Sequence, residues 1–165
     1  MERSMDLVTD AEVTVARLVA VPRERMWELI TAIGRIGEWS PETVRIDAPP
    51  ELVPGARFVG HNRYPDGFVS TVTCEITEFD RPAVFAFTAL DEHGVPASLW
   101  RYELQDGRHP ETTLVRQTFR HGPGITGMRV AANADERSLD SRLATLGANM
   151  LTTIAAMTTQ TQLTP

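Results

Sequence analysis

Lysine is absent from the sequence, since all 16 of its basic residues are arginines. No lysine is therefore available for a Schiff base or for the phosphate-binding lysine of a P-loop. Cysteine is almost absent, and the single Cys74 excludes an internal disulfide and favours a reducing compartment. No segment approaches the roughly 20 apolar residues of a membrane-spanning helix, and residues 1–10 lack the apolar core of a signal peptide. We therefore expect a cytoplasmic protein that does not insert into a membrane.

Positive charge is also scarce, because the formal net charge is −6. Neutralising phosphate groups requires a basic surface, so nucleic acid is excluded as a partner. The 165 residues, of which 42% are hydrophobic and 23% charged, are typical of a globular protein of one domain. We expect a single domain over residues 1–165, with residues 1–10 forming a loose tail.

Most of the sequence that follows is typical of β-strands. Residues 11–21 alternate apolar and polar side chains, which predicts a first strand, and Pro22 then introduces one or two short helices that end near Gly37. From residue 43 to residue 121 we expect six further strands, separated by turn sequences such as YPDG and QDGRHPE. Parallel neighbours would need crossovers of about a dozen residues, so these strands are expected to form an antiparallel sheet.

The C-terminal segment has a different period. Between residues 135 and 161 apolar side chains recur at intervals of three and four, which predicts one long amphipathic helix. Strands, short helices and a final long helix in this order indicate the α+β class. We expect the sheet and its short helices over residues 11–121, a connecting loop over 122–134 and the helix over 135–161.

A glycine motif lies at the junction between the last strand and the long helix. In HGPGITG, residues 121–127, Gly122, Gly124 and Gly127 match the G-x-G-x-x-G spacing of dinucleotide-binding loops. That function requires a βαβ unit, in which the pyrophosphate rests on the N-terminus of the helix. The preceding strand has no parallel neighbour and no strand follows the long helix. We attribute the match to chance, interpret the segment as a flexible connection and expect no cofactor.

Four segments carry a resemblance to a known family. They are VAVPRERMWELITAIGRIGEWSP, PGARFVGHNR, TVTCEITEFDRPAVFAF and WRYELQDGRHPETTLVRQTF, in this order within residues 11–120. In these segments the sequence resembles the polyketide cyclase/dehydrase-like proteins of the START-related helix-grip (SRPBCC) superfamily. The resemblance implies a curved seven-stranded antiparallel sheet wrapped around the C-terminal helix, with an apolar cavity for a lipid, sterol or polyketide. Family members often carry an acidic residue on the last strand, where this sequence has Gln117.

Strand alternation predicts which side chains face such a cavity, because every second residue points to the same side of a sheet. The polar residues on the predicted inward face each need a partner in the protein, in water or in a ligand. Together with neighbouring apolar residues they form the predicted ligand-binding set, which is Trp39, Phe58, Asn62, Cys74, Phe85, Phe87, Trp100, Tyr102, Gln117, Phe119, Met150 and Ile154.

Core packing is the competing interpretation of this set. Neighbouring protein groups can satisfy Asn62 and Tyr102. Cys74 has no basic neighbour in the sequence that would lower its pKa, so an inert thiol is expected. The large aromatic and methionine side chains fill cores more often than they line ligand sites.

Candidates for acid–base chemistry are few. Tyr102 lies on the inward face, and His121 shares the parity of Gln117 and is expected at the rim of the cavity. A histidine in such a place is more often non-catalytic. The four histidines lack the short spacings of a metal site, so no metal is expected, and no serine lies in a Gly-x-Ser-x-Gly context.

These observations favour binding of a small, mostly hydrophobic molecule. One alternative is a polyketide cyclase or dehydratase, in which Asn62, Tyr102 and Gln117 orient the substrate and His121 moves a proton. Another is a regulatory or interaction subunit. A homodimer formed through a sheet edge or through loops is left open.

The charge of the ligand follows from the same alternation. A carboxylate would call for an inward arginine, but Arg63, Arg101 and Arg116 all have outward parity. We therefore expect a neutral ligand with one or two oxygen atoms close to the amides of Asn62 and Gln117.

Overall fold

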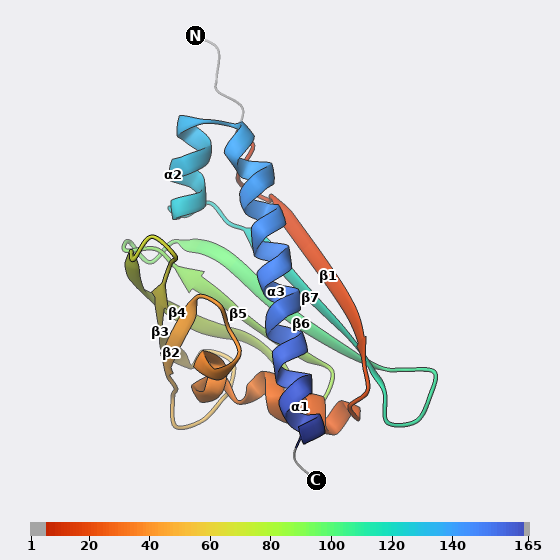
Figure 1. The fold of residues 1–165 in the computed structure, drawn as a ribbon. Coiled ribbons are helices and arrows are strands. Elements are labelled where there is room, and N and C mark those ends of the chain that lie inside the picture. The colour runs from red at the N-terminus through yellow and green to blue at the C-terminus, as the bar shows by residue number, and fades with distance from the viewer. Residues whose placement is uncertain (1–5, 164–165) are drawn as a thin grey trace.

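A computed structural model describes residues 6–163, and Figure 1 shows how its elements are arranged. The strands are β1 (Glu12–Val19), β2 (Thr43–Asp47), β3 (Arg57–Arg63), β4 (Val69–Asp80), β5 (Val84–Leu90), β6 (Pro96–Asp106) and β7 (Thr113–His121). The helices are α1 (Arg23–Thr31), the 3-10 helix η1 (Ile33–Glu38), α2 (Gly127–Ala134) and α3 (Arg137–Leu163).

The seven strands form one antiparallel sheet in the order β1-β7-β6-β5-β4-β3-β2. Strands β2 to β7 follow one another as neighbours, and β1 pairs with β7 at the other edge. The helix α3 runs along the sheet from α2 at one end to α1 at the other (Figure 1). The predicted seven-stranded antiparallel sheet with a long C-terminal helix is confirmed.

Burial in the strands has a period of two. In β7 the side chains of Thr113, Val115, Gln117, Phe119 and His121 are buried, whereas those between them are exposed or half-buried. One face of the sheet therefore lies against the helices and the other faces solvent, as expected for an antiparallel sheet covered on one side.

The core is densest where α1 and the C-terminal half of α3 meet the sheet. Trp27 of α1 packs edge-on against Phe85, with ring centroids 6.5 Å apart. Ile154 and Met157 of α3 are 0% and 1% exposed and belong to the same cluster. Complete burial of side chains of this size contributes about 1.5–3 kcal/mol each, so this end of the molecule holds α3 on the sheet.

Two expected segments differ from the structure. Residues 122–134, expected as a connecting loop, contain the helix α2, whose N-cap Thr126 accepts a hydrogen bond from the Arg129 N–H. The long helix begins at Arg137 and reaches Leu163 instead of spanning residues 135–161.

The expected loose tail is also partly wrong. Residues 1–5 of that tail lie outside the described residues. In the described part, Asp6 accepts hydrogen bonds from the backbone N–H groups of Val8 and Thr9, and Val8 is 3% exposed. Asp6 also pairs with Arg129 of α2, so this part of the segment is tied to the rest of the molecule.

The glycines of the HGPGITG segment have a packing role. The Gly122 and Gly124 N–H groups donate to the carbonyl oxygens of Ala97 and Pro96 in β6, both at 2.8 Å. A Cβ atom at Gly122 would lie 2.5 Å from the Pro96 oxygen. Glycine is required here because the chain passes β6 too closely for a side chain, and the two N–H groups are engaged by protein carbonyls instead of being directed at a phosphate.

No helix among residues 6–163 combines the length and the apolar character needed to span a membrane.

Candidate functional site

The concave face of the sheet carries a continuous aromatic row, formed by Phe58, Phe87, Trp100 and Phe119. Trp100 lies opposite Phe87 on β5 and opposite Phe119 on β7 in the strand register. The Phe87 and Trp100 rings are stacked with centroids 6.4 Å apart, and the Phe58 and Phe119 rings meet them edge-on at 5.2 and 5.0 Å. All four belong to the predicted ligand-binding set, and the fold brings them together from the strands β3, β5, β6 and β7.

The aromatic row is incompletely covered. Phe85, two residues before Phe87 on β5, is 0% exposed, but Phe87 and Trp100 are only half-buried although they face inward. The helix α3, which covers this face, is also less buried toward its N-terminus, where Leu143 and Leu146 are half-buried. The concave face is therefore sealed near α1 and partly accessible toward the N-terminal half of α3.

Gln117 and Tyr102 form a polar pair beside the aromatic row. They lie opposite each other on β7 and β6 and are each 5% exposed. Within residues 6–163 the Oε1 atom of Gln117 is buried and finds no hydrogen-bond donor. Burial raises the pKa of the Tyr102 phenol above its ordinary value, and a hydrogen bond from the Gln117 amide opposes that rise. Tyr102 is therefore a neutral phenol at pH 7.

Asn62 does not join this pair. The Thr43 hydroxyl donates to Asn62 Oδ1 at 2.8 Å, and Asn62 Nδ2 donates to the Ser70 hydroxyl at 3.3 Å. Asn62 is on β3 and Gln117 is on β7, with three strands between them, so about 19 Å of sheet separates the two positions. The two amides expected to hold one polar end of a ligand lie far apart, and the amide of Asn62 is already bonded within the protein.

His121 is a structural side chain at the start of the β7–α2 connection. It is 0% exposed, its Nδ1 lies 2.6 Å from the Gly122 carbonyl oxygen, and its Nε2 lies 2.5 Å from the Thr126 hydroxyl. Since a carbonyl only accepts, Nδ1 carries the proton and Nε2 accepts from Thr126. Burial lowers the pKa of His121 below its usual value.

Tyr102 and His121 do not form an acid–base pair. Tyr102 lies opposite Gln117, whereas His121 lies opposite Ser98. The two positions are four residues apart along the strands, which corresponds to about 13 Å. The candidate groups for proton transfer are thus held in separate surroundings.

Glu42 is a titratable residue that the sequence reasoning missed. Its carboxylate accepts a hydrogen bond at 3.0 Å from Asn149 of α3. Glu42 is half-buried, and desolvation raises the pKa of its carboxyl group, with the Asn149 hydrogen bond acting against the rise. It precedes β2 in a segment without strand or helix periodicity, so no pattern in the sequence indicated that it would reach α3.

The remaining predicted site residues lie in the core. Burial raises the pKa of the Cys74 thiol to about 12. Trp39 is 3% exposed, and the Arg35 guanidinium lies 4.8 Å from its ring centroid. Met150 and Ile154 are 3% and 0% exposed on the inner side of α3. Among the described side chains, no three His, Cys, Asp or Glu residues gather where they could hold a metal ion.

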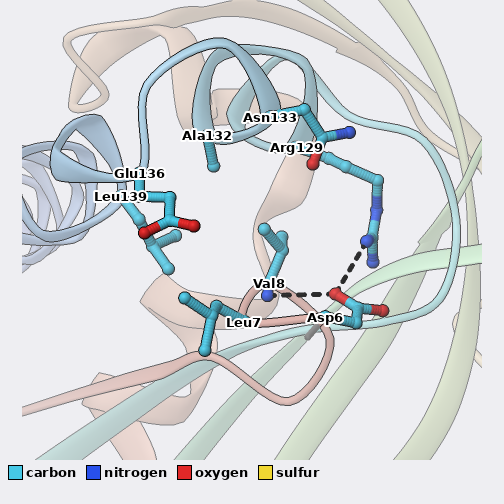
Figure 2. A pocket seen from close by; sticks show the side chains of 8 residues that line it. All are labelled: Asp6, Leu7, Val8, Arg129, Ala132, Asn133, Glu136 and Leu139. Atoms are coloured by element: carbon cyan, nitrogen blue, oxygen red, sulfur yellow. Dashed lines mark hydrogen bonds and ion pairs between the residues drawn. The ribbon is translucent and has the colours of Figure 1, made fainter. Parts of the chain in front are cut away.

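A pocket of about 410 Å³ lies at the α2 end of the molecule, between residues 6–8, α2 and the start of α3 (Figure 2). Arg129 and Asp6 pair at 3.0 Å on one side, and Glu136 and Leu139 lie on the other. A hydrogen bond from the Thr9 hydroxyl is the largest cause of the lowered pKa of Asp6. A second pocket, of about 350 Å³, adjoins Pro22 and the β6–β7 turn. Neither pocket is lined by any of the predicted ligand-binding residues.

The order of the elements and the helix lying across the sheet have a counterpart in a known family. The family model described as polyketide cyclase/dehydrase and lipid transport matches residues 10–150. The chain belongs to this family. The match covers all seven strands and the first half of α3, so it includes the aromatic row and the Gln117–Tyr102 pair.

Solved structures of several proteins share the fold described above. The Polyketide_cyc-like protein Cgl2372 from Corynebacterium glutamicum has a TM-score of 0.64 and 19% identity, with 92% of this chain and 91% of that chain covered. Protein Ms6760 from Mycobacterium smegmatis has a TM-score of 0.64 and 20% identity, with 93% and 92% covered. Protein MLL2253 from Mesorhizobium loti has a TM-score of 0.64 and 18% identity, with 94% and 99% covered. At such identities the likeness concerns the fold.

No curated protein matches the chain. What this member of the polyketide cyclase/dehydrase and lipid transport family can do is therefore argued from its own side chains. The family and the fold suggest binding of a hydrophobic ligand. The described geometry adds an apolar, partly accessible surface with one unpaired acceptor beside it.

Proposed function

We propose that the protein binds a small, neutral, mostly hydrophobic molecule, such as a polyketide, a lipid or a sterol-like compound, between the sheet and α3. The observation that carries the proposal is the partial exposure of Phe87 and Trp100, two aromatic side chains that face inward. Covering such surface with an apolar ligand is favourable by about 25 cal/mol for each Å² removed from water.

The charges of the sheet support a neutral ligand. Arg101 is paired with Glu78 at 2.8 Å, and Arg63 and Arg116 are exposed. The buried polar side chains of β6 and β7 carry hydroxyls, one amide, a phenol and an imidazole whose pKa is lowered by burial, and they are Ser98, Tyr102, Thr113, Gln117 and His121. A charged ligand head would lose its hydration there without gaining a partner of opposite charge, which is costly.

A neutral fluorescent probe tests the proposal. N-phenyl-1-naphthylamine becomes more fluorescent when it enters an apolar site, and the purified protein should bind it saturably. Phe87→Asp places a charge in the aromatic row and should abolish this binding. The matched control is Phe68→Asp, because Phe68 is 63% exposed in the β3–β4 turn and should leave binding unchanged.

Near-ultraviolet circular dichroism shows whether each variant is folded. Leu146→Asp provides a second test on the half-buried side of α3, where a charge is better tolerated by the fold. Native mass spectrometry of the protein as purified should also show a retained apolar molecule. Failure of the wild-type protein to bind the probe, or unchanged binding by folded Phe87→Asp and Leu146→Asp, contradicts the proposal.

A further inference from the structure

We infer that the bound molecule carries a hydroxyl group and that this hydroxyl donates a hydrogen bond to Gln117 Oε1. The inference rests on the proposed function, because it concerns the polar end of the same site. Its basis is the buried Oε1 atom, which has no donor within the described part of the chain although Gln117 is only 5% exposed. Buried polar atoms in native proteins are almost always paired with protein or with ordered water, so an unpaired one next to a partly accessible surface calls for a donor from outside the chain.

The chemistry of the amide determines which ligand group fits. An amide oxygen only accepts hydrogen bonds. A ketone, an ester or an ether would bring a second acceptor to Oε1 and leave both oxygens unpaired. The Gln117 amide also lies beside the Tyr102 phenol, which is opposite it in the strand register and whose burial-raised pKa it partly lowers. A ligand hydroxyl supplies the donor that the Gln117 side chain lacks.

Gln117 and Tyr102 share a register row with the fully buried Phe85, directly next to the row of the half-buried Phe87 and Trp100. Gln117 is two residues from Phe119 on β7, and Tyr102 is two residues from Trp100 on β6. Two residues of a strand span about 7 Å. A molecule of two fused rings that lies on Trp100 and Phe87 therefore extends far enough to bring a hydroxyl at its end to Oε1.

The same reasoning removes Asn62 from the ligand site. Its oxygen accepts from Thr43 and its nitrogen donates to Ser70. Nothing about Asn62 calls for a ligand, which makes it the matched control for Gln117: both are amides with inward parity on strands of one sheet, and only one has an unpaired oxygen.

Three probes separate the possibilities: 2-naphthol, which can donate, 2-methoxynaphthalene, which can only accept, and naphthalene, which can do neither. Their dissociation constants are measured by displacement of N-phenyl-1-naphthylamine. The quantity of interest is the ratio of the dissociation constants of 2-methoxynaphthalene and 2-naphthol. Because one hydrogen bond to a buried acceptor is at stake, this ratio should fall by about fivefold to thirtyfold in Gln117→Met and remain unchanged in Asn62→Leu.

Nuclear magnetic resonance of the wild-type protein gives a second readout that needs no variant at Gln117. The side-chain carbonyl carbon of Gln117 should shift on addition of 2-naphthol and shift much less with 2-methoxynaphthalene. If the ratio is the same in wild type and Gln117→Met, or if 2-methoxynaphthalene produces the larger shift, the inferred hydroxyl is wrong although binding stands. If none of the probes binds the folded wild-type protein, the proposed function itself fails.

Discussion

Replacing Gly122 with alanine tests whether the glycines of the HGPGITG segment serve packing. A Cβ atom at this position would lie 2.5 Å from the Pro96 carbonyl oxygen and 3.1 Å from the Pro96 carbonyl carbon. Both are backbone atoms of β6, so the contact is relieved only if the chain moves away and weakens the hydrogen bond from the Gly122 N–H to Ala97. Overpacking costs about 1–3 kcal/mol and a lost hydrogen bond about 1 kcal/mol.

Gly127 supplies the matched control, because it belongs to the same motif and begins α2. A Cβ atom there would meet nothing within 4 Å. Alanine at a helical position free of contacts is expected to stabilise by about 0.4–1 kcal/mol. Gly122→Ala should therefore lower the free energy of unfolding by about 2–4 kcal/mol, while Gly127→Ala leaves it equal or slightly higher.

Urea denaturation followed by circular dichroism measures both variants. For a protein of this length the loss in Gly122→Ala corresponds to a decrease in Tm on the order of 4–16 °C. Unfolding free energies of the two variants that agree within about 0.5 kcal/mol would show that the chain does not pass β6 as closely as described, and the structural explanation of the motif would be refuted.

Three further predictions concern titratable groups. Because the pKa of His121 is lowered in the folded state, the unfolded state binds a proton more tightly than the folded state. The free energy of unfolding, measured by urea denaturation, should therefore be constant above about pH 6.5 and decrease below it. In His121→Gln this decrease should be less steep. Burial raises the pKa of the Cys74 thiol to about 12, so it should not react with Ellman's reagent at pH 8 in the folded protein. In urea it should react fully. Fast reaction without denaturant would contradict the burial of Cys74. The pKa of Glu42 is raised in the folded state, so ionisation of Glu42 destabilises the fold as the pH rises through that pKa. Glu42→Gln should therefore be at least as stable as wild type at pH 7, and the difference should be smaller at pH 4. A clearly lower free energy of unfolding for Glu42→Gln at pH 7 would show that the charge is needed.

Strand β7 shows what the local sequence pattern is able to predict. The alternation of residues 115–121 predicted that Val115, Gln117, Phe119 and His121 face inward, and their burial follows that pattern. This was predictable because side chains alternate in any strand, whatever the strand packs against. The antiparallel order was predictable from turn lengths for a similarly local reason.

The helix α2 could have been predicted from the sequence but was missed. Thr126 is an N-cap residue, and GMRVAANA after it contains good helix formers. The three glycines led to the prediction of a flexible loop instead. Their close approach to β6 depends on where β6 lies, which the residues of the segment itself do not reveal.

The sequence by itself determined the class of fold, the inward set of side chains and the absence of an inward arginine on the strands. Only the tertiary structure decided which inward polar groups already have partners. Asn62 is satisfied by Thr43, 19 residues away, and Glu42 is bound by Asn149, 107 residues away, whereas Gln117 is left with a free oxygen. Alternation specifies the direction in which a side chain points, but a hydrogen bond requires atoms of distant segments to meet within about 3 Å, and that depends on how the whole sheet curves beneath α3.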